Sequence, residues 1–286
     1  MQPTRTWVTE AQGDYLELSY KIKAVLFSEQ SPFQKVEIVD TDFFGKILLN
    51  DDLVMLTEKD EFIYHEMLAH VPLFVHPDPK RVLIIGGGDG GTAREVLRHT
   101  GVATCRVVEI DPVVVRACRQ HLPGLASSFD QPRLALQIED GVKFMADTAQ
   151  TFDVILIDST DPVGPATPLF GLDFYQQVAR CLAPNGIVVS QAESPFMFAA
   201  MQRKLLEILC QCFEVVSCYN YSNMSYPGGL WSFAFASPQL HPLQDFESDR
   251  PAASDLSFRY YSSAMHQAAF TLPPFMRDRL APFLTI

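Results

Sequence analysis

The pattern of hydrophobic and polar residues divides this 286-residue chain into two parts. From about residue 16 to residue 56, β-branched and aromatic residues alternate with polar ones, and Pro, Gly and Asn interrupt the alternation. Such alternation is typical of antiparallel strands that bury one face. It predicts strands at 21–27, 35–39 and 46–49, and therefore a small N-terminal antiparallel β domain that we place at residues 1–57.

A helix should connect this β domain to the rest of the chain. Thr57 and Asp60 have the spacing of a capping-box variant, which begins a helix. Apolar residues at helical spacing continue to Val71. Pro72 comes next, and because proline lacks an amide donor we expect the helix to end there.

From Lys80 onward, short apolar runs alternate with amphipathic stretches. Wholly apolar runs are typical of parallel strands buried on both faces, and the stretches between them have helical spacing. Strands are expected at 82–85, 105–110, 134–138, 152–157 and 187–190, with helices at 93–99, 113–121, 142–147 and 173–181. Segments 214–219 and 231–236 should add edge strands, and 241–286 a helical tail. Residues 58–286 therefore predict an α/β domain with a doubly wound, Rossmann-like sheet.

Composition narrows the class of protein. The formal net charge of −12 argues against a nucleic-acid binder, which would need clustered Lys and Arg. The first twelve residues lack the apolar stretch of a signal peptide, and no run of 18 uncharged apolar residues predicts a membrane span. The six cysteines are scattered and are expected to be reduced thiols, which indicates a cytoplasmic protein.

Candidate binding residues follow the first three strands of the α/β domain. Residues 86–91 read GGGDGG, and glycines such as Gly86 and Gly88 let a ligand approach the backbone closely. Glu109 ends the next strand, where a carboxylate accepts hydrogen bonds from ribose hydroxyls. Asp140 and Gly141 follow the third strand, where they could read an adenine edge. Since parallel strands bind ligands at their carboxyl ends, these residues together predict a site for an adenosyl compound.

Asp89 is an unusual residue for such a loop, because it places a negative charge among the glycines. Adenosylmethionine enzymes hold the methionine carboxylate there, and two unit charges about 4 Å apart repel by roughly 4 kcal/mol at an effective dielectric near 20. A ligand that lacks this carboxylate and carries an amine avoids the repulsion. Asp89 therefore disfavours ordinary adenosylmethionine, and also the pyrophosphate of a dinucleotide.

Two further carboxylates, Asp158 and Asp161, follow the fourth strand. With Asp89 they would surround one cavity with acids. An amine whose pKa is near 10 is free base in only about one molecule in a thousand at pH 7, so an amine nucleophile needs a carboxylate that accepts its proton. The same three acids could instead bind a divalent metal.

Long motifs in this sequence resemble the spermidine synthase (polyamine aminopropyltransferase) family. They are 61–66 (EFIYHE), 82–91 (VLIIGGGDGG), 108–111 (VEID), 140–141 (DG) and 158–165 (DSTDPVGP). The similarity extends to 30–34 (QSPFQ), 226–229 (YPGG) and 260–273 (YYSSAMHQAAFTLP), and so covers nearly the whole chain.

The resemblance implies an activity and a role for each matching residue. It implies a class I methyltransferase-like fold and transfer of an aminopropyl group from decarboxylated S-adenosylmethionine to putrescine, which gives spermidine and methylthioadenosine. The implied catalytic base is Asp158. The implied substrate-binding residues are Tyr64, His65, Asp89, Asp161, Gln191 and Tyr226. The residues implied to hold the thioadenosine part are Gln34, Gly86, Gly88, Glu109, Asp140, Gly141 and Pro165.

The resemblance also has implications for cofactors and oligomeric state, and two positions depart from it. It implies no metal and no cofactor, since decarboxylated S-adenosylmethionine is a co-substrate, and it implies a homodimer or homotetramer. Thr167 and Phe33 depart from the family, in which Glu and Tyr are commoner at these positions. The acceptor could also be cadaverine, agmatine or spermidine. A methyltransferase, a non-catalytic binding protein and a nicotinamide oxidoreductase are the alternatives from other classes.

Overall fold

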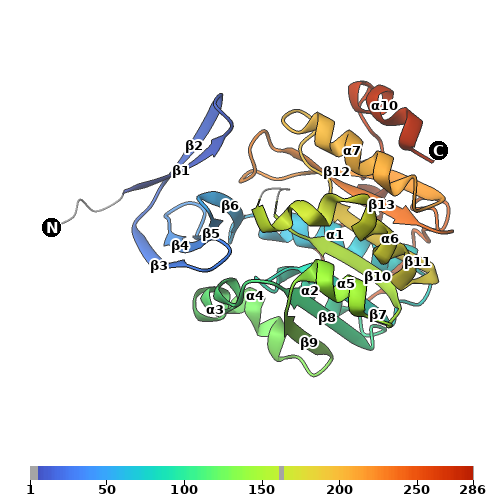
Figure 1. Cartoon of the computed structure of the whole chain (residues 1–286), viewed down its shortest axis with the longest axis horizontal. Coiled ribbons are helices and arrows are strands. Elements are labelled where there is room, and N and C mark those ends of the chain that lie inside the picture. Colours follow the sequence, from blue (N-terminus) through green and yellow to red (C-terminus); the bar gives the residue numbers. More distant parts are fainter. Residues whose placement is uncertain (1–5, 161–163, 286) are drawn as a thin grey trace.

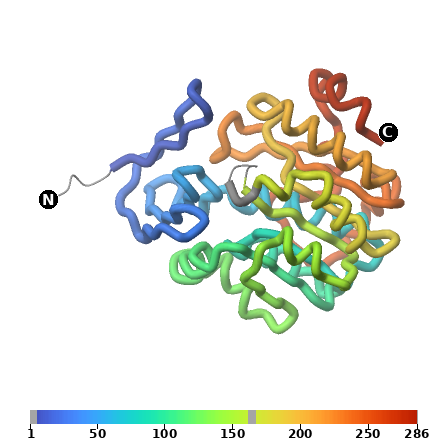
Figure 2. The backbone as a smooth tube through the Cα atoms, viewed as in Figure 1, coloured from blue at the N-terminus to red at the C-terminus, as the bar shows by residue number. Residues whose placement is uncertain are grey.

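The structure, a computed structural model, describes residues 6–160 and 164–285, and the side chains of 164–166 are left out. It has a smaller N-terminal lobe of strands beside a larger α/β body (Figures 1 and 2). In the lobe, β1 (Trp7–Gln12) and β2 (Leu16–Lys21) form a hairpin. A four-stranded antiparallel sheet follows, in the order β3 (Ala24–Gln30), β4 (Lys35–Asp40), β5 (Lys46–Asn50) and β6 (Leu53–Thr57).

The prediction of a single strand over 21–27 is wrong. The hairpin ends at Lys21 and the second sheet begins at Ala24, so the residues between them carry the chain from one sheet to the other. Ile22 is buried in a core that both sheets share, and the Lys23 amide donates to the Asp40 carbonyl at 2.8 Å. The strands β1 and β6 were not anticipated from the sequence.

Helix α1 (Glu61–Val75) contradicts the prediction that Pro72 ends it. Proline inside a helix costs about 3 kcal/mol, because one backbone hydrogen bond is lost and the ring crowds the preceding turn. The three residues that follow, Leu73, Phe74 and Val75, are all buried in the main core. Each buried side chain of this size contributes about 1.5–3 kcal/mol, so their burial outweighs the cost of the proline.

The central sheet has seven strands in the order β12-β13-β11-β10-β7-β8-β9. The parallel strands are β7 (Arg81–Gly86), β8 (Thr104–Glu109), β9 (Leu134–Ile138), β10 (Phe152–Asp158) and β11 (Leu182–Gln191). The antiparallel strands are β12 (Val215–Ser222) and β13 (Leu230–Ser237). The chain winds outward from β7 in one direction and then from β10 in the other. The predicted fold class, a doubly wound sheet with a small antiparallel β domain, is confirmed.

Helices cover both faces of this sheet, as Figure 1 shows. Val82 and Ile84 of β7 point to one face, with α1, α2 (Gly91–Arg98) and α3 (Pro112–His121). Leu83 and Ile85 point to the other, with α5 (Gly141–Asp147), α6 (Leu172–Cys181) and α7 (Ala199–Leu209). Burial on both faces explains why these strands are wholly apolar in sequence.

Short helices complete the fold. They are α4 (Pro123–Ala126), η1 (Ser127–Asp130), η2 (Gly164–Phe170), α8 (Arg250–Ala253), α9 (Ser263–Ala269), α10 (Pro274–Leu280) and η3 (Ala281–Phe283). Among the described residues, none of the helices combines the length and apolar character that crossing a bilayer requires. The six cysteines are free thiols, as expected, although Cys210 is exposed and Cys212 half-buried.

Candidate active site

A cavity of about 240 Å³ lies between the N-terminal lobe and the central sheet. Its walls come from the carboxyl ends of β7, β8 and β10, from β1, β5 and β6, and from the loop between β12 and β13. The predicted site residues that line it are Gln34, Tyr64, His65, Gly86, Gly88, Asp89, Glu109, Asp140, Gly141, Asp158, Gln191 and Tyr226. Asp161 and the side chain of Pro165 lie outside the described residues.

Asp158 is the last residue of β10 and reaches into this cavity. The hydroxyl of Tyr64 donates to its Oδ1 at 2.8 Å, and the hydroxyl of Thr92 donates to its Oδ2 at 2.6 Å. Burial, followed by the nearby charge of Asp89, raises the pKa of Asp158 to about 6. A carboxylate with this pKa is ionised near neutral pH and is a stronger base than an ordinary aspartate.

Several residues of the glycine-rich loop must be glycine, Gly86 and Gly88 among them. Gly86 has φ of +86°, and a Cβ there would lie 2.0 Å from the Asp158 carbonyl oxygen. A Cβ on Gly88 would lie 2.8 Å from the carboxylate of Glu109. The sequence predicts that these glycines leave room for a ligand. The structure shows that they also leave room for Asp158 and Glu109, and so bring both carboxylates to the cavity.

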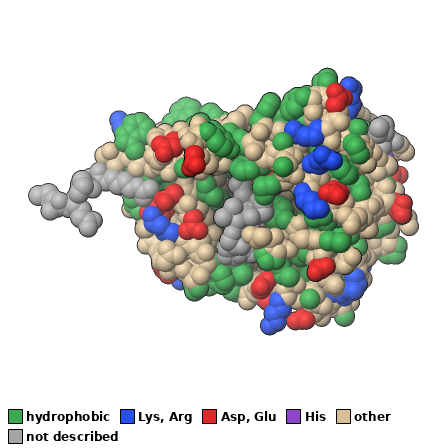
Figure 3. All heavy atoms as spheres, turned by 45° about the horizontal axis from the view of Figure 1, so that its top comes forward, with side chains coloured by type: hydrophobic (Ala, Val, Ile, Leu, Met, Phe, Trp, Pro, Cys, Tyr) green, Lys and Arg blue, Asp and Glu red, His purple; other side chains and the backbone are tan. Residues whose placement is uncertain are grey.

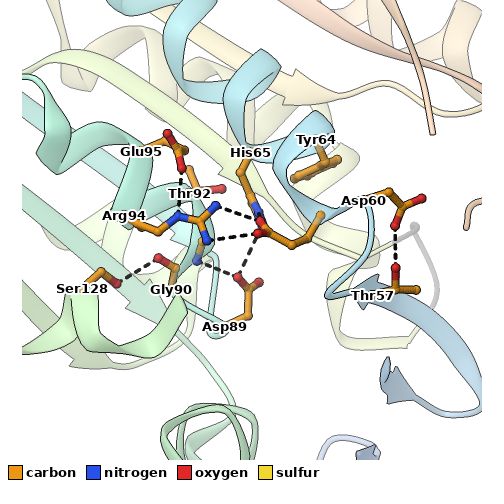
Figure 4. Close-up of polar contacts among 12 residues, drawn as sticks. Thr57, Asp60, Tyr64, His65, Asp89, Gly90, Thr92, Arg94, Glu95 and Ser128 are labelled. Atoms are coloured by element: carbon orange, nitrogen blue, oxygen red, sulfur yellow. Dashed lines mark hydrogen bonds and ion pairs between the residues drawn. The ribbon is translucent and has the colours of Figure 1, made fainter. Parts of the chain in front are cut away.

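Asp89 and His65 both line the cavity and face one another (Figure 4). The Gly91 amide donates to Asp89 Oδ1 at 2.7 Å, and His65 Nε2 lies 3.4 Å from the same oxygen. Burial alone would raise the pKa of Asp89, but the His65 charge and the Gly91 amide outweigh it and lower this pKa. Asp89 is therefore an ionised carboxylate paired with an imidazole, which the sequence did not reveal.

Aromatic rings form the apolar wall next to these acids. The ring of Tyr64 contacts that of Tyr226 edge to face at 6.1 Å, and Tyr226 packs on Trp231 at 5.3 Å. The Tyr226 hydroxyl donates to the Met55 carbonyl at 2.7 Å, so the β12–β13 loop is tied to β6. An apolar wall beside carboxylates suits an amine that must lose its proton.

A second group of cavity residues is the one expected to bind an adenosyl group. Glu109 is buried, its Oε1 accepts the Asp111 amide at 2.8 Å, and burial raises its pKa to about 7. Gln34 donates to Asp111 Oδ2 at 3.2 Å. Asp140 is the N-cap of α5, where its Oδ1 accepts the Val142 amide at 2.8 Å. Asp111 thus fixes both Glu109 and Gln34, although it does not line the cavity itself.

Gln191 ends β11 and is buried beside the cavity. Its Oε1 accepts the Glu193 amide at 3.3 Å. Glu193 has φ of +65° and is 1% exposed, so the protein encloses it. Among the described residues, Glu193 does not line the cavity.

Glu10, Gln12 and Thr92 are among the polar residues of the site that were not predicted from the sequence. Glu10 and Gln12 line the cavity from β1, are both buried, and share a hydrogen bond of 2.9 Å. Thr92 holds Asp158. Alternation along β1 could have indicated that Val8, Glu10 and Gln12 share a face. No feature of the local sequence indicates that this face packs towards the central sheet.

His65, Asp89 and Asp158 each present one ligand atom within 4.8 Å of the others. This trio has the donors of a transition-metal site. Glu61 lies 2.6 Å from the other nitrogen of His65, an arrangement also found behind metal-binding histidines. The geometry alone therefore accommodates either a metal or an imidazolium between the two acids.

Comparison with known proteins identifies the family. A family described as spermine/spermidine synthase domain matches residues 61–248, and one described as spermidine synthase tetramerisation domain matches residues 6–58. The chain belongs to the spermidine synthase family. A polyamine aminopropyltransferase of Alkaliphilus metalliredigens is 45% identical over 276 residues, covering 96% of this chain and 97% of the relative. That of Methanocaldococcus jannaschii is 42% identical, covering 95% and 94%.

Solved structures agree with this assignment. A spermidine synthase in complex with the transition-state analogue AdoDATO has a TM-score of 0.95 and 37% identity, covering 99% of this chain and 98% of that one. Spermidine synthase from Thermotoga maritima has a TM-score of 0.93 and 37% identity, with coverage of 99% and 97%. This chain is therefore an aminopropyltransferase, and the predicted family and enzyme class are confirmed.

Proposed function

We propose that this aminopropyltransferase uses decarboxylated S-adenosylmethionine as donor and putrescine as acceptor, and releases spermidine and methylthioadenosine. The observation that carries the proposal is that Asp89 and Asp158, which have oxygens within 4.8 Å of each other, line the same cavity as Glu109 and Asp140. Asp89 and Asp158 suit an amine, and Glu109 and Asp140 offer hydrogen-bond acceptors to a nucleoside. A single cavity can thus bring donor and acceptor together.

Asp89 supports a donor without a carboxylate. It is ionised, and its loop is where an adenosylmethionine carboxylate would lie. Because His65 pairs with Asp89, the repulsion of a donor carboxylate is smaller than for two bare anions. The amine of the decarboxylated donor would instead gain a charge-assisted hydrogen bond from Asp89.

The proposed reaction is an in-line displacement with Asp158 as base. Asp158 accepts a proton from the acceptor ammonium, and the free amine then forms a bond to the donor carbon next to sulfur. The bond from that carbon to sulfur breaks, its electrons return to sulfur, and neutral methylthioadenosine leaves. Holding both reactants in one cavity supplies a large part of the acceleration.

The remaining residues are proposed to bind the two substrates. Asp161, Gln191, Tyr64, Tyr226 and His65 would form the channel for the amine and the aminopropyl group. Gln34, Gly86, Gly88, Gly141 and Pro165 would hold the thioadenosine, together with Glu109 and Asp140. We propose that no metal and no further cofactor takes part.

We also propose that Glu10 receives the distal ammonium of the acceptor, because it is a buried acid that lines the cavity from the N-terminal lobe.

A product assay tests this function. The enzyme is incubated with decarboxylated S-adenosylmethionine or S-adenosylmethionine, each with putrescine, cadaverine, agmatine or spermidine, and products are identified by mass spectrometry. We expect spermidine and methylthioadenosine in equal amounts from the decarboxylated donor and putrescine. A higher kcat/KM with another amine would show that this amine, and not putrescine, is the preferred acceptor. Methylated products from intact adenosylmethionine would contradict the proposed donor.

We further propose that the chain assembles through its N-terminal lobe. Large apolar side chains are exposed on this lobe, to the left in Figure 3. They are Trp7, Tyr15, Val25, Leu26 and Phe43. All five lie within the segment that matches the tetramerisation domain. Covering such residues favours a homodimer or homotetramer.

A further inference from the structure

A row of buried and half-buried charges of alternating sign leads away from the active site (Figure 4). Asp89 faces Nε2 of His65, and Nδ1 of His65 lies 2.6 Å from Glu61 Oε2. Arg94 grips Glu61 with two hydrogen bonds, from Nη1 at 3.0 Å and from Nη2 at 2.9 Å. Its Nε donates to Glu95 at 2.8 Å. Glu61, Arg94 and Glu95 do not line the cavity, so their effect on chemistry must pass through His65.

Gly91 makes room for this arrangement. A Cβ at this position would lie 2.2 Å from Cε1 of His65 and 2.5 Å from both ring nitrogens. The imidazole ring therefore rests directly on the backbone of Gly91. The last glycine of the GGGDGG motif is required by His65 of the same chain and not by the turn, since its φ is not positive.

We propose that Glu61 and Arg94 are positioning residues, which hold His65 as an imidazolium between Asp89 and the base Asp158 so that both carboxylates stay ionised in a buried site. The proposal deepens the proposed function, because it rests on Asp158 acting as the base. It assigns the positive charge within the trio of His65, Asp89 and Asp158 to the protein itself. A divalent metal is then not needed there.

The charges around His65 favour its protonated form. The groups that face it are Glu61 and Tyr64 on α1, Asp89 in the glycine-rich loop and Asp158 on β10. Arg94 on α2 contacts Glu61. Burial alone lowers the pKa of His65, but the carboxylates of Asp89 and Glu61 outweigh it and raise the pKa to about 10. The His65 charge in turn lowers the pKa of Asp158, against burial and Asp89.

Arg94 has a separate part in this row. Its planar guanidinium holds both oxygens of Glu61, which fixes the carboxylate towards His65. Burial would raise the pKa of Glu61, but His65 and Arg94 outweigh it and lower this pKa. Glu61 therefore stays an anion, and a neutral Glu61 could not stabilise the imidazolium.

The direct test follows the protonation of His65 by NMR. Imidazole resonances of the full-length enzyme are titrated from pH 5 to pH 11, and His65→Asn assigns the His65 signal. We expect His65 to stay protonated through pH 8, and its midpoint to fall by about one pH unit or more in Glu61→Gln, the usual effect of removing a neighbouring charge. This readout needs no substrate, so it stands even if Asp158 is not the base.

Two results of this titration would overturn the proposal. One is a neutral His65 at pH 7 in the unmodified enzyme. The other is a midpoint that Glu61→Gln does not move. A neutral His65 whose signal shifts when Zn²⁺ is added would replace the imidazolium with a metal site.

A kinetic test displaces His65 without removing any charged residue. Gly91→Ala forces the ring away from Asp89, so the pKa of Asp158 should rise, and the acidic limb of kcat/KM should move up by about one pH unit. The rate should recover at higher pH, whereas general damage would lower it at every pH. Gly101→Ala is the matched control, because nothing lies within 4 Å of a Cβ at Gly101. An unmoved limb in a folded Gly91→Ala enzyme would contradict the proposal.

Discussion

Asp158 acquires its chemistry from its neighbours. Tyr64 and Thr92 each donate a hydrogen bond to it, which favours the ionised form, while burial and Asp89 favour the protonated form. The second pair of effects is stronger, so the pKa rises to about 6. The side chain is therefore poised to accept a proton near neutral pH, as a general base must be.

Asp158→Asn should lower kcat by about a thousandfold, within the usual range for loss of a general base. Asparagine keeps the shape and can still accept one of the two hydroxyl hydrogen bonds. Binding of methylthioadenosine, measured by calorimetry, should change little, because the proposed role of Asp158 is toward the amine. An unimpaired rate in this variant would remove Asp158 from the role of base.

The pH dependence of kcat/KM should report the pKa of Asp158. Since the base must be ionised and the pKa of Asp158 is about 6, kcat/KM should fall below about pH 6 and stay high above it. Steady-state rates between pH 4.5 and 8 measure this limb. Residual activity of Asp158→Asn should lack it, and a wild-type limb near pH 4 would show that Asp158 is an ordinary aspartate.

At the scale of elements, the hairpin β1–β2 changes the character of the cavity. Burial alternates along β1, so Val8, Glu10 and Gln12 point inward. The hairpin thereby adds a further acid, Glu10, which is far in sequence from the acids at the carboxyl ends of the central sheet. A diamine has two ammonium groups, and two separate acids suit its two ends.

Glu10→Gln should raise KM for the acceptor by about tenfold, the usual scale for a lost charged hydrogen bond. It should leave methylthioadenosine binding unchanged, because Glu10 lies on the other wall. Glu17→Gln on the same hairpin is the control, since Glu17 is exposed. Equal KM values for the two variants would exclude Glu10 from acceptor binding.

Helix α1 is the second element whose full length matters to the site. Tyr64 and His65 sit near its start, and the residues after Pro72 anchor its other end in the core. A helix that ended at Pro72 would lose part of this anchor. The rigid placement of Tyr64 and His65 therefore depends on packing that the proline rule does not consider.

At the scale of the whole molecule, the active site lies between two units that have separate sheets. Ser31 and Gln34 from the N-terminal lobe both donate to Asp111, at the end of β8. This contact joins the lobe to the sheet next to Glu109. Assembly through the lobe would therefore act on the region that closes one side of the cavity.

Val25→Asp should reduce the mass of the assembly seen in analytical ultracentrifugation, because a charge buried in an apolar interface is costly. Leu243→Asp is the matched control: both side chains are 41% exposed, but Leu243 lies in the C-terminal tail. A monomeric wild type, or an assembly that Val25→Asp leaves intact, would contradict assembly through the lobe.

Much of this protein could be predicted from its sequence. The strands of the central sheet are apolar runs, and glycine, aspartate and glutamate follow them at the ends where parallel sheets bind ligands. Asp158, Asp89 and Glu109 could be identified because they occupy these positions. Local periodicity and residue type were enough to identify these three residues.

Only the tertiary structure decided how the charges of the active site balance one another and which elements form the walls of its cavity. Glu10 reaches the cavity because β1 folds against a distant sheet, and His65 pairs with Asp89 because Gly91 lets its ring approach. The pattern of residues along a strand predicts which side chains are buried, but not which distant residues they contact. The pKa of a buried group depends on charges within a few ångströms of it in space, and folding alone brings those charges together.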